Sequence, residues 1–183
     1  YEKDRLSLIS NESSEIVLIL NLLNSQSECK FNKIKNCDPR VLNLINESIN
    51  DGVYKCGFAR DQKAYIYSSK KLFAGLKEID FMLKNNGGPW IFGKTLTIAD
   101  IYLFPTIIRW ELIYSKLFNC TQEDISEFKS IISWRLNFYN LEGIADTCFD
   151  KNWVNDYFKV IFPLNPNQII PLQPSLTKIL KKL

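Results

Sequence analysis

The residue types available for chemistry in this 183-residue chain are limited by the complete absence of histidine. Without histidine there is no Ser-His or Cys-His nucleophile pair, no histidine-ligated zinc site and no histidine general base. Chemistry must therefore use tyrosine, cysteine, carboxylates, lysine or arginine. The five cysteines are odd in number and contain no Cys-x-x-Cys pair, so neither a disulfide framework nor a zinc knuckle is indicated. A reducing compartment and no bound metal are expected.

A helix start near residue 13 offers a first potential binding site. Ser13 or Ser14 stands where an N-cap belongs, and apolar residues follow at helical spacing from Ile16 to Leu23. The spacing predicts a helix over about residues 14–24. Its first amides are free donors at the positive end of the helix dipole. Two interpretations follow from this segment alone: the serines only cap the helix, or the helix start binds an anionic group such as a carboxylate.

A second local signal is a capping box at Thr97 and Asp100. Thr97 can accept the amide of Asp100, while the Asp100 carboxylate reaches back to the Thr97 amide. The helix behind it runs to about Leu117 and is apolar almost all round, which predicts a buried central helix with a kink or a lost hydrogen bond at Pro105. The capping box is a folding device first.

Arg109 lies on this otherwise apolar helix and needs a partner. Either it faces a binding pocket, or it pairs with a nearby carboxylate such as Glu111 or Asp100.

The remaining pattern divides the chain into three parts. Residues 1–24 begin with a strand, a polar turn and a second short strand, and residues 25–39 form a polar linker closed by Pro39. Residues 40–183 are helical almost throughout. Helices are expected over a stretch that includes Leu42 to Ile49, over about 62–84, 126–139 and 151–160, and from Thr97 onward, with a break at Asn86–Pro89. The proline-rich segment 162–174 cannot be helical, and Ile169, Ile170 and Leu172 predict that it packs on the body.

Composition excludes some classes of protein. The net charge is only +3, and basic residues are scattered except for three lysines near the C-terminus, which argues against nucleic-acid binding. The longest apolar run, Ile16 to Leu20, is too short for a membrane span, and residue 1 opens no signal peptide. A soluble, cytoplasmic protein is expected, and an organelle is not excluded by the sequence.

Several segments resemble a known family. The Gly-Pro-Trp-Ile-Phe-Gly-Lys loop and the capping box behind it are similar to the C-terminal domain of glutathione transferases. Five further segments resemble the glutathionyl-hydroquinone reductases, which are omega-like (Xi-class) glutathione transferases. The order and spacing of these segments fit this family across the chain. The segments are Asn50–Ala59, Arg109–Tyr114 with Phe118 and Cys120, Gly143–Thr147, Asp156–Phe158, and Leu164–Pro166 with Ile169–Pro171.

The resemblance implies a mainly α protein. Residues 40–183 would be the helical C-terminal bundle with an extended tail, and residues 1–24 the end of a thioredoxin-like domain, with a β-hairpin and a helix. It implies glutathione as co-substrate, an aromatic quinol conjugate as substrate and a homodimer formed through the helical domain. Glu12 and Ser13 would bind the γ-glutamyl end of glutathione. Tyr65 and Tyr157 would lie over the quinol pocket, with Arg109 at its edge, unless both tyrosines are ordinary half-buried aromatics.

The sequence also departs from the family. The catalytic cysteine of the family lies in a Cys-Pro-Trp-type motif, which is absent here and is expected upstream of Tyr1. Cys56 and Cys120 are expected on buried helical segments, as small apolar residues. Leu117 and Asp156 stand where family histidines are expected. Two alternatives therefore remain: an inactive transferase-like domain that serves as an interaction or assembly module, and an omega-like thiol transferase without quinone specificity.

Overall fold

A computed structural model describes residues 10, 12, 15–17, 19–20 and 34–181 of the chain. The chain divides into two compact units, residues 1–36 and 37–183. In the first unit, residues 15–17 and 19–20 are helical, within the helix expected from the sequence. The hydroxyl of Ser10 donates to the carboxylate of Glu15 at 2.7 Å. The expected hairpin before Ser10 lies outside the described residues, and the proposed division at residues 24 and 39 stays a prediction.

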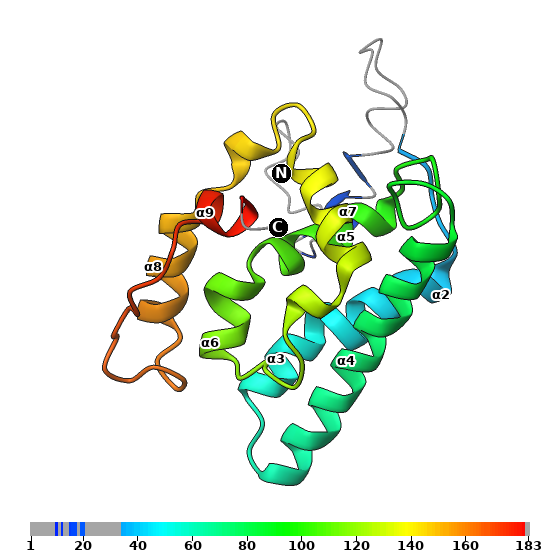
Figure 1. Ribbon diagram of the computed structural model, residues 1–183. Coiled ribbons are helices and arrows are strands. Elements are labelled where there is room, and N and C mark those ends of the chain that lie inside the picture. Colours follow the sequence, from blue (N-terminus) through cyan, green and yellow to red (C-terminus); the bar gives the residue numbers. More distant parts are fainter. Residues whose placement is uncertain (1–9, 11, 13–14, 18, 21–33, 182–183) are drawn as a thin grey trace. The chain divides into compact units, whose positions relative to one another are not determined.

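The second unit is a helical bundle, and all named elements of the described residues are helices (Figure 1). In chain order they are α2 (Pro39–Asn43), the π-helix η1 (Leu44–Asn50), α3 (Asp51–Gly57), α4 (Gln62–Asn85), α5 (Ile98–Ile108), the π-helix η2 (Trp110–Tyr114), α6 (Ser115–Leu117), the 3-10 helix η3 (Ile125–Glu127), α7 (Lys129–Tyr139), the 3-10 helix η4 (Ala145–Thr147), α8 (Asp150–Val160) and α9 (Leu176–Leu180). Among the described helices, none is long and apolar enough to cross a membrane.

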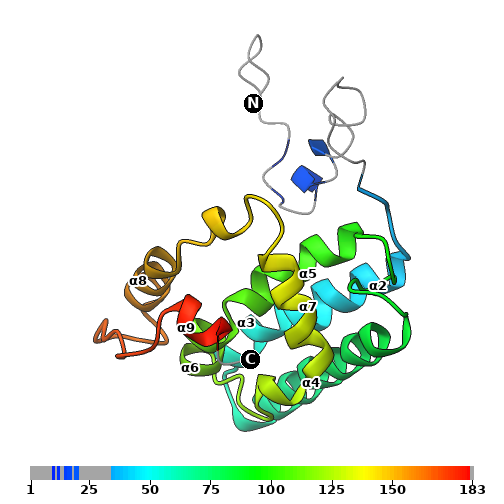
Figure 2. The same ribbon diagram turned by 45° about the horizontal axis from the view of Figure 1, so that its top comes forward.

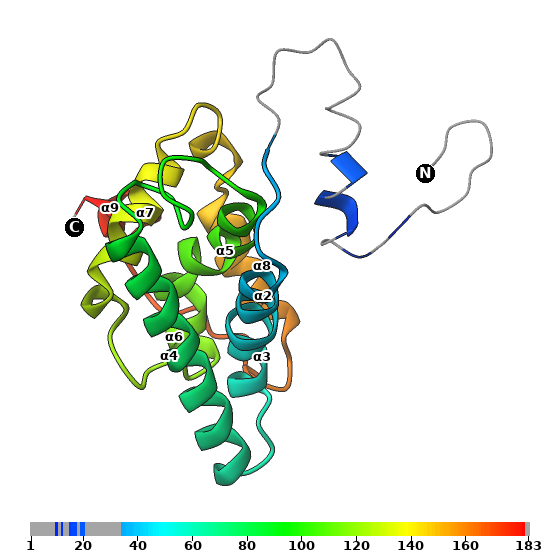
Figure 3. The same ribbon diagram turned by 90° about the vertical axis from the view of Figure 1, so that its right-hand side faces the viewer.

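The first helical segment of this unit begins at Pro39, which the sequence reading had assigned to the end of the linker. Asp38 caps α2 by accepting the amide of Arg40 at 2.9 Å, and a proline is well tolerated in the first turn of a helix. The helix continues without a break through η1 into α3. It lies alongside the long helix α4, as the views in Figures 1 and 3 agree. The expected long helix over 62–84 is confirmed as α4.

The buried central helix expected from the sequence is α5, and its capping box is formed. Asp100 is fully buried and accepts four hydrogen bonds. Its Oδ2 accepts the amide of Thr97 at 2.8 Å and the Thr97 hydroxyl at 3.0 Å, while its Oδ1 accepts the amide of Ile91 at 3.0 Å and the indole N–H of Trp134 at 2.9 Å. Asp100 therefore joins the loop before α5, the start of α5 and α7.

Helix α5 continues through Pro105 to Ile108. Near the proline, the side chain of Asn50 bridges two groups of α5: its amide donates to the carbonyl of Tyr102 at 2.9 Å, and its oxygen accepts the hydroxyl of Thr106 at 2.6 Å. After α5 the backbone widens into the π-helix η2. A side chain of η1 thus provides hydrogen-bond partners for the Tyr102 carbonyl and the Thr106 hydroxyl of α5.

The last two expected helices are confirmed as α7 and α8, with shifted starts. Helix α7 begins at Lys129, after the separate 3-10 turn η3, instead of at about residue 126. Its first amides, those of Ser130 and Ile131, donate to the carboxylate of Asp80 on α4 at 2.9 and 3.0 Å. The N-terminus of α7 is therefore capped from another helix. Figure 2 shows α8, α9 and the tail at one side of the bundle.

The prediction that Ile169, Ile170 and Leu172 pack the tail on the body is wrong, because Leu172 is fully exposed and Ile169 and Ile170 are 66% and 36% exposed. Leu164 of the tail packs against the core instead. Polar bonds add to this contact. The Asn165 amide donates to the Phe158 carbonyl at 2.7 Å and to the Ile169 carbonyl at 3.0 Å, and the Lys116 ammonium donates to Gln173 at 2.6 Å. The segment is not helical, as its prolines predict.

Candidate functional site

Three tyrosine hydroxyls meet where α3, η2 and α8 come together. The hydroxyl of Tyr157 on α8 lies 2.8 Å from the hydroxyl of Tyr54 on α3 and 3.2 Å from that of Tyr114 at the end of η2. These three residues are called the tyrosine cluster. Tyr114 is 2% exposed and Tyr54 is 39% exposed, so the cluster extends from the core to the surface. It is a set of phenol donors and acceptors at the edge of an apolar body.

The rings of the cluster are held by edge-to-face packing on Phe118. Its ring centroid lies 5.2 Å from that of Tyr54, 5.4 Å from that of Tyr114 and 6.0 Å from that of Tyr157. Such aromatic pairs are each worth about 0.5–1.5 kcal/mol beyond their buried area. Gly57 allows this arrangement, because a Cβ there would lie 2.3 Å from Cδ1 of Phe118.

Burial raises the pKa of Tyr54 and Tyr114, the two tyrosines bonded to Tyr157. Burial, followed by the hydrogen bond with Tyr157, raises the pKa of Tyr54 from 10.0 to about 12. Burial also raises the pKa of the Tyr114 hydroxyl, and the neighbouring phenols add to that effect. A smaller opposing effect comes from the Arg109 guanidinium, which lowers the pKa of Tyr54. Near neutral pH both phenols can therefore donate hydrogen bonds.

An open cavity of about 560 Å³ lies beside the exposed part of this cluster. It is formed where α3 ends and α4 begins, and Tyr54, Phe58 and Ala64 contribute apolar surface to it. Arg60 and Asp61 contribute charged groups. It is wide open to solvent, so it is a shallow hollow in the surface and not an enclosed pocket.

Tyr65 lies between two residues of the cavity lining, Ala64 and Ser68, and its hydroxyl has a different hydrogen-bond partner from that of Tyr157. Its hydroxyl donates to the carbonyl of Asn119 at 2.8 Å, and Asn119 has a positive φ of 55°. Tyr65 thus fixes the loop after α6. Tyr157 instead contacts Tyr54 and Tyr114. That Tyr65 and Tyr157 line one pocket stays a prediction.

The two carboxylate partners considered for Arg109 are both wrong. Glu111 is paired with Arg135, and Asp100 is bonded to its own capping partners. The guanidinium of Arg109 lies 4.6 Å from the ring centroid of Trp153 on α8 and donates to the carbonyl of Pro105 at 3.0 Å. A cation over an indole ring is worth about 0.5–2 kcal/mol. Its Nε is buried and has no hydrogen-bond partner among the described residues.

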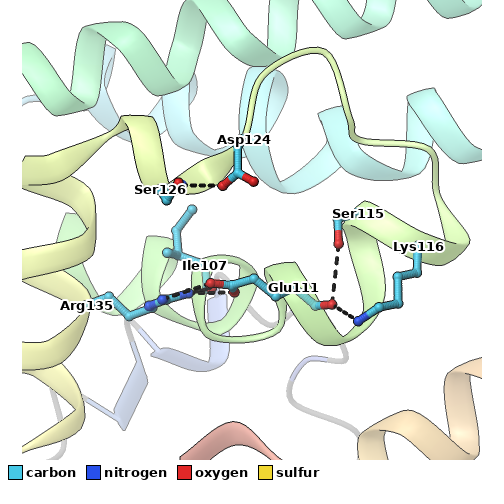
Figure 4. A network of polar contacts seen from close by, with 7 residues as sticks. All are labelled: Ile107, Glu111, Ser115, Lys116, Asp124, Ser126 and Arg135. Atoms are coloured by element: carbon cyan, nitrogen blue, oxygen red, sulfur yellow. Dashed lines mark hydrogen bonds and ion pairs between the residues drawn. The ribbon is translucent and has the colours of Figure 1, made fainter. Parts of the chain in front are cut away.

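The segment η2 that carries Tyr114 is held by a buried ion pair, shown in Figure 4. Arg135 on α7 is fully buried and donates to both carboxylate oxygens of Glu111, at 2.7 and 3.0 Å. It also donates to the carbonyl of Ile107 at 3.3 Å. The Glu111 carbonyl accepts from Ser115 at 3.4 Å and from the Lys116 ammonium. The ion pair connects α7 to η2, and Ser115 and Lys116 donate to a backbone carbonyl of this π-helix.

The expected glutathione-binding residues lie in the first unit. The side chain of Glu12 is exposed, and its carbonyl accepts the amide of Ile16 at 2.9 Å, which is a helical bond. Ser13 lies outside the described residues. Leu117, which stands where a family histidine is expected, is 7% exposed and belongs to the core, whereas Asp156 is exposed.

Tyr54 and Tyr114 were not selected from the sequence, although a signal for them was present. Each member of the tyrosine cluster lies in one of the segments that carried the family resemblance: Asn50–Ala59, Arg109–Tyr114 and Asp156–Phe158. Segments far apart in the chain that share a family pattern often share a site. Nothing local indicates that their hydroxyls meet. In the described residues no group of acidic or thiol side chains is arranged to hold a metal ion.

Comparison with known proteins identifies the helical unit. Residues 67–139 match the family model "Glutathione S-transferase, C-terminal domain". The glutathione-bound structure of YqjG, described as a glutathione transferase homolog from Escherichia coli K-12, superposes on 92% of this chain and 56% of its own, with 30% identity and a TM-score of 0.84. The helical unit is thus similar in sequence and fold to the C-terminal domain of glutathione S-transferases.

Two curated relatives narrow the resemblance. Glutathionyl-hydroquinone reductase YqjG of Escherichia coli is 30% identical over 95% of this chain and 54% of its own length. Glutathionyl-hydroquinone reductase PcpF of Sphingobium chlorophenolicum is 31% identical over 96% of this chain and 57% of its own length. The chain thus spans about half the length of these relatives. The tyrosine cluster and the adjoining cavity lie on the helical unit, and of the three tyrosines Tyr114 lies within the matched residues 67–139.

Proposed function

We propose that this chain is the helical part of a glutathione-dependent enzyme that reduces glutathionyl-hydroquinones. The observation that carries the proposal is the tyrosine cluster, in which three family-like segments bring three phenols together and one of them, Tyr54, lines an open cavity. Two relatives named as glutathionyl-hydroquinone reductases support it, since they align with nearly the whole chain. Glutathione would be the co-substrate, and no metal would take part.

The reaction needs a thiolate that the proposal places upstream of Tyr1. That thiolate attacks the glutathionyl sulfur of the conjugate, the bond between this sulfur and the aromatic carbon breaks, and the hydroquinone leaves after taking up a proton. A mixed disulfide between the enzyme and glutathione remains. A second glutathione then attacks this disulfide, which restores the thiol and releases glutathione disulfide. The chain itself would contribute binding and orientation.

The tyrosines would serve the phenol oxygens of the substrate. The Tyr54 hydroxyl is protonated near neutral pH, and it can donate to a phenolate oxygen as charge develops there. Tyr157 links Tyr54 to the buried Tyr114, so its hydroxyl position is fixed. Tyr65 and Arg109 complete the proposed pocket, with Arg109 supplying positive charge near Tyr54.

The first unit would bind the other end of the ligand. Glu12 would pair with the γ-glutamyl amino group, and Ser13 with the start of the helix would bind its carboxylate. The free amides of a helix N-terminus favour a carboxylate at this point. A homodimer formed through the helical domain belongs to the same proposal.

A second candidate function is an assembly module of the same fold without catalysis. Leu117 and Asp156 favour this function, because they stand where the resemblance implies histidines. The side chain of Leu117 is buried in the core, and that of Asp156 is exposed. Such a module would bind a protein partner and would not need glutathione.

Glutathione titration of the full-length protein separates these two functions. The enzyme proposal expects saturable binding that weakens about tenfold or more in Glu12→Ala and in Ser13→Ala, since a lost charge-assisted bond costs about 1.5–3 kcal/mol. Glu47→Ala, an exposed carboxylate on η1, is the matched control and should bind like the unchanged protein. Unchanged affinity in both test variants would refute the site, and no binding at all would favour the module.

A further inference from the structure

A groove lies between helix α8 and the proline-containing tail that follows it. Its volume is about 400 Å³, and it is open to solvent along one side. The tail contributes residues 170–175 and α8 contributes residues of its first two turns, while the buried side chain of Leu112 comes from η2. Figure 1 shows the tail running back along α8. No member of the tyrosine cluster lines this groove, which is called the tail groove.

Hydrogen bonds fix the tail beside α8 before, along and after the groove. Before it, the side-chain amide of Asn165 donates to two backbone carbonyls, at 2.7 and 3.0 Å. Along it, the Lys116 ammonium donates to Oε1 of Gln173 at 2.6 Å. After it, the amide of Leu176 donates to the Asp150 carboxylate at 2.9 Å, and the Leu176 side chain is buried. The tail groove is therefore a fixed feature of the fold.

Apolar side chains supply most of the surface of the tail groove. They are aliphatic groups and proline rings, from Leu112, Val154, Ile170, Pro171, Leu172 and Pro174. Leu172 is fully exposed and Ile170 is 36% exposed, so water covers apolar groups that a ligand in the groove would shield. Removing such surface from water is favourable in proportion to its area. An occupant with an apolar body is therefore expected.

The charged groups of the tail groove favour an anion. Lys151 lines the groove, and its ammonium group takes part in none of the ion pairs among the described residues. Asp150 is the single carboxylate of the lining, and its two oxygens already accept the amides of Lys151 and Leu176, at 2.8 and 2.9 Å. A carboxylate on the ligand would complement the ammonium group, whereas a cation would be repelled by it.

The shape of the groove favours a small molecule over a protein partner. Eleven residues line it, whereas a stable protein interface takes roughly 20–30 residues on each side. Pro171 and Pro174 have no amide hydrogen, so this part of the tail cannot form the regular ladder that an added peptide strand needs. A linear alkyl chain needs no hydrogen bonds and can lie along the extended tail.

We infer that the tail groove binds a small alkyl carboxylate, with the alkyl chain on Leu112, Val154 and the tail and the carboxylate at the Lys151 ammonium group. The ligand has one apolar body and one anionic end, which are the two features that the lining presents. The site is separate from the tyrosine cluster, and it does not depend on the proposed function.

Isothermal titration calorimetry of the full-length protein with decanoate tests the inference. Saturable binding is expected, with a Kd of about 1 mM or tighter, as for a ligand of this size in an open site. Decyltrimethylammonium has the same chain and the opposite charge, and it should bind about threefold or more weakly. No saturable binding of decanoate would overturn the inference, and so would equal affinities for the two probes.

Variants of exposed side chains locate the site. Leu172→Gln should raise the Kd for decanoate about threefold or more, since the groove loses an apolar side chain. Its matched control is Ile169→Gln, in the same tail but outside the lining, which should leave the Kd unchanged. Lys151→Gln should raise the Kd about two- to fivefold, as for the loss of an exposed ion pair, whereas Lys159→Gln on α8 outside the lining should not.

Two outcomes of these variants would contradict the assigned site or occupant. An unchanged Kd in both Leu172→Gln and Lys151→Gln would place decanoate elsewhere on the protein. Sedimentation that shows a self-association lost in Leu172→Gln and unaffected by decanoate would show that a second copy covers the groove. Both exposed side chains lie outside the core, so neither substitution removes a core contact.

Discussion

The buried carboxylate of Asp100 is the residue whose loss should destabilise this domain most clearly. Asp100 is fully buried and accepts four hydrogen bonds, from Thr97, Ile91 and Trp134. A hydrogen bond to a charged group is worth about 1.5–3 kcal/mol, and each donor left buried without a partner costs about 1–3 kcal/mol. These contributions are not additive. Asp100→Ala should therefore lower the free energy of unfolding by at least about 4 kcal/mol.

Asp100→Asn should lower the free energy of unfolding by less, about 2 kcal/mol. One side-chain oxygen still accepts hydrogen bonds, whereas the new NH2 group lies against donors and cannot accept from them. The matched control is Asp124→Ala, which removes an exposed carboxylate that accepts one amide bond, from Ser126 at 2.8 Å (Figure 4). Its loss should cost about 1 kcal/mol, as for an ordinary helix cap. Urea unfolding, followed by tryptophan fluorescence, measures the free energy of unfolding of the three variants. Their midpoints can be compared where the dependence on urea concentration (the m-value) is the same. A midpoint for Asp100→Ala no lower than that of Asp124→Ala would refute the role given to Asp100.

Three further perturbations test the surroundings of the tyrosine cluster. Arg135→Ala should lower the free energy of unfolding by about 3–5 kcal/mol, because it leaves the Glu111 carboxylate without its buried partner. Gly57→Ala should cost about 1–3 kcal/mol in the same unfolding assay, since its Cβ must displace the Phe118 ring. The raised pKa of Tyr54 stabilises the fold fully below pH 10.0, the pKa of a free tyrosine, and this contribution should be lost as the pH rises to about 12. Unfolding curves over this range should therefore show a loss that is smaller in Tyr54→Phe, in which the raised pKa of Tyr114 still contributes.

Each of these has a control. Arg135→Met combined with Glu111→Leu should recover much of the stability lost in Arg135→Ala, and no recovery would show that the loss is one of packing. Gly143→Ala introduces a Cβ at a positive φ of 79° with nothing nearby, so it measures backbone strain without a clash. Tyr67→Phe alters a tyrosine that is 71% exposed, and it should leave the alkaline loss of stability in place. If the loss in Tyr54→Phe were as large as in the unchanged protein, the role given to Tyr54 would be wrong.

Local patterns predicted the parts of this fold whose partners are close in the chain. The capping box is one, since Thr97 and Asp100 are three residues apart and the geometry of a helix start fixes the bond. Helix α4 is another, because its apolar stripe repeats over many turns. The start of α7 was misplaced because its cap, Asp80, comes from α4, and spacing along α7 carries no trace of it.

The candidate site was less accessible to sequence reasoning. Tyr157 was selected because a family segment contains it, yet its partners Tyr54 and Tyr114 are brought to it only by the packing of α3, η2 and α8. For Arg109 the sequence predicts either a pocket-facing position or a carboxylate partner, because charged residues seldom lie in a core alone, whereas its guanidinium lies over the aromatic face of Trp153. In both cases the deciding contact joins residues more than 40 positions apart, where a sequence pattern has no geometric information.

The most direct test of the proposed function is turnover by the full-length protein. Release of free hydroquinone from a glutathionyl-hydroquinone is followed in the presence of glutathione, for the unchanged protein and for Tyr157→Phe. The proposal expects glutathione-dependent release, and it expects kcat/KM to fall about tenfold or more in the variant, because Tyr54 loses the hydroxyl that positions it as a donor to the developing oxyanion. Absence of release by the unchanged protein, with glutathione bound, would contradict the proposed activity. Equal kcat/KM in the two proteins would contradict the role given to the tyrosine cluster.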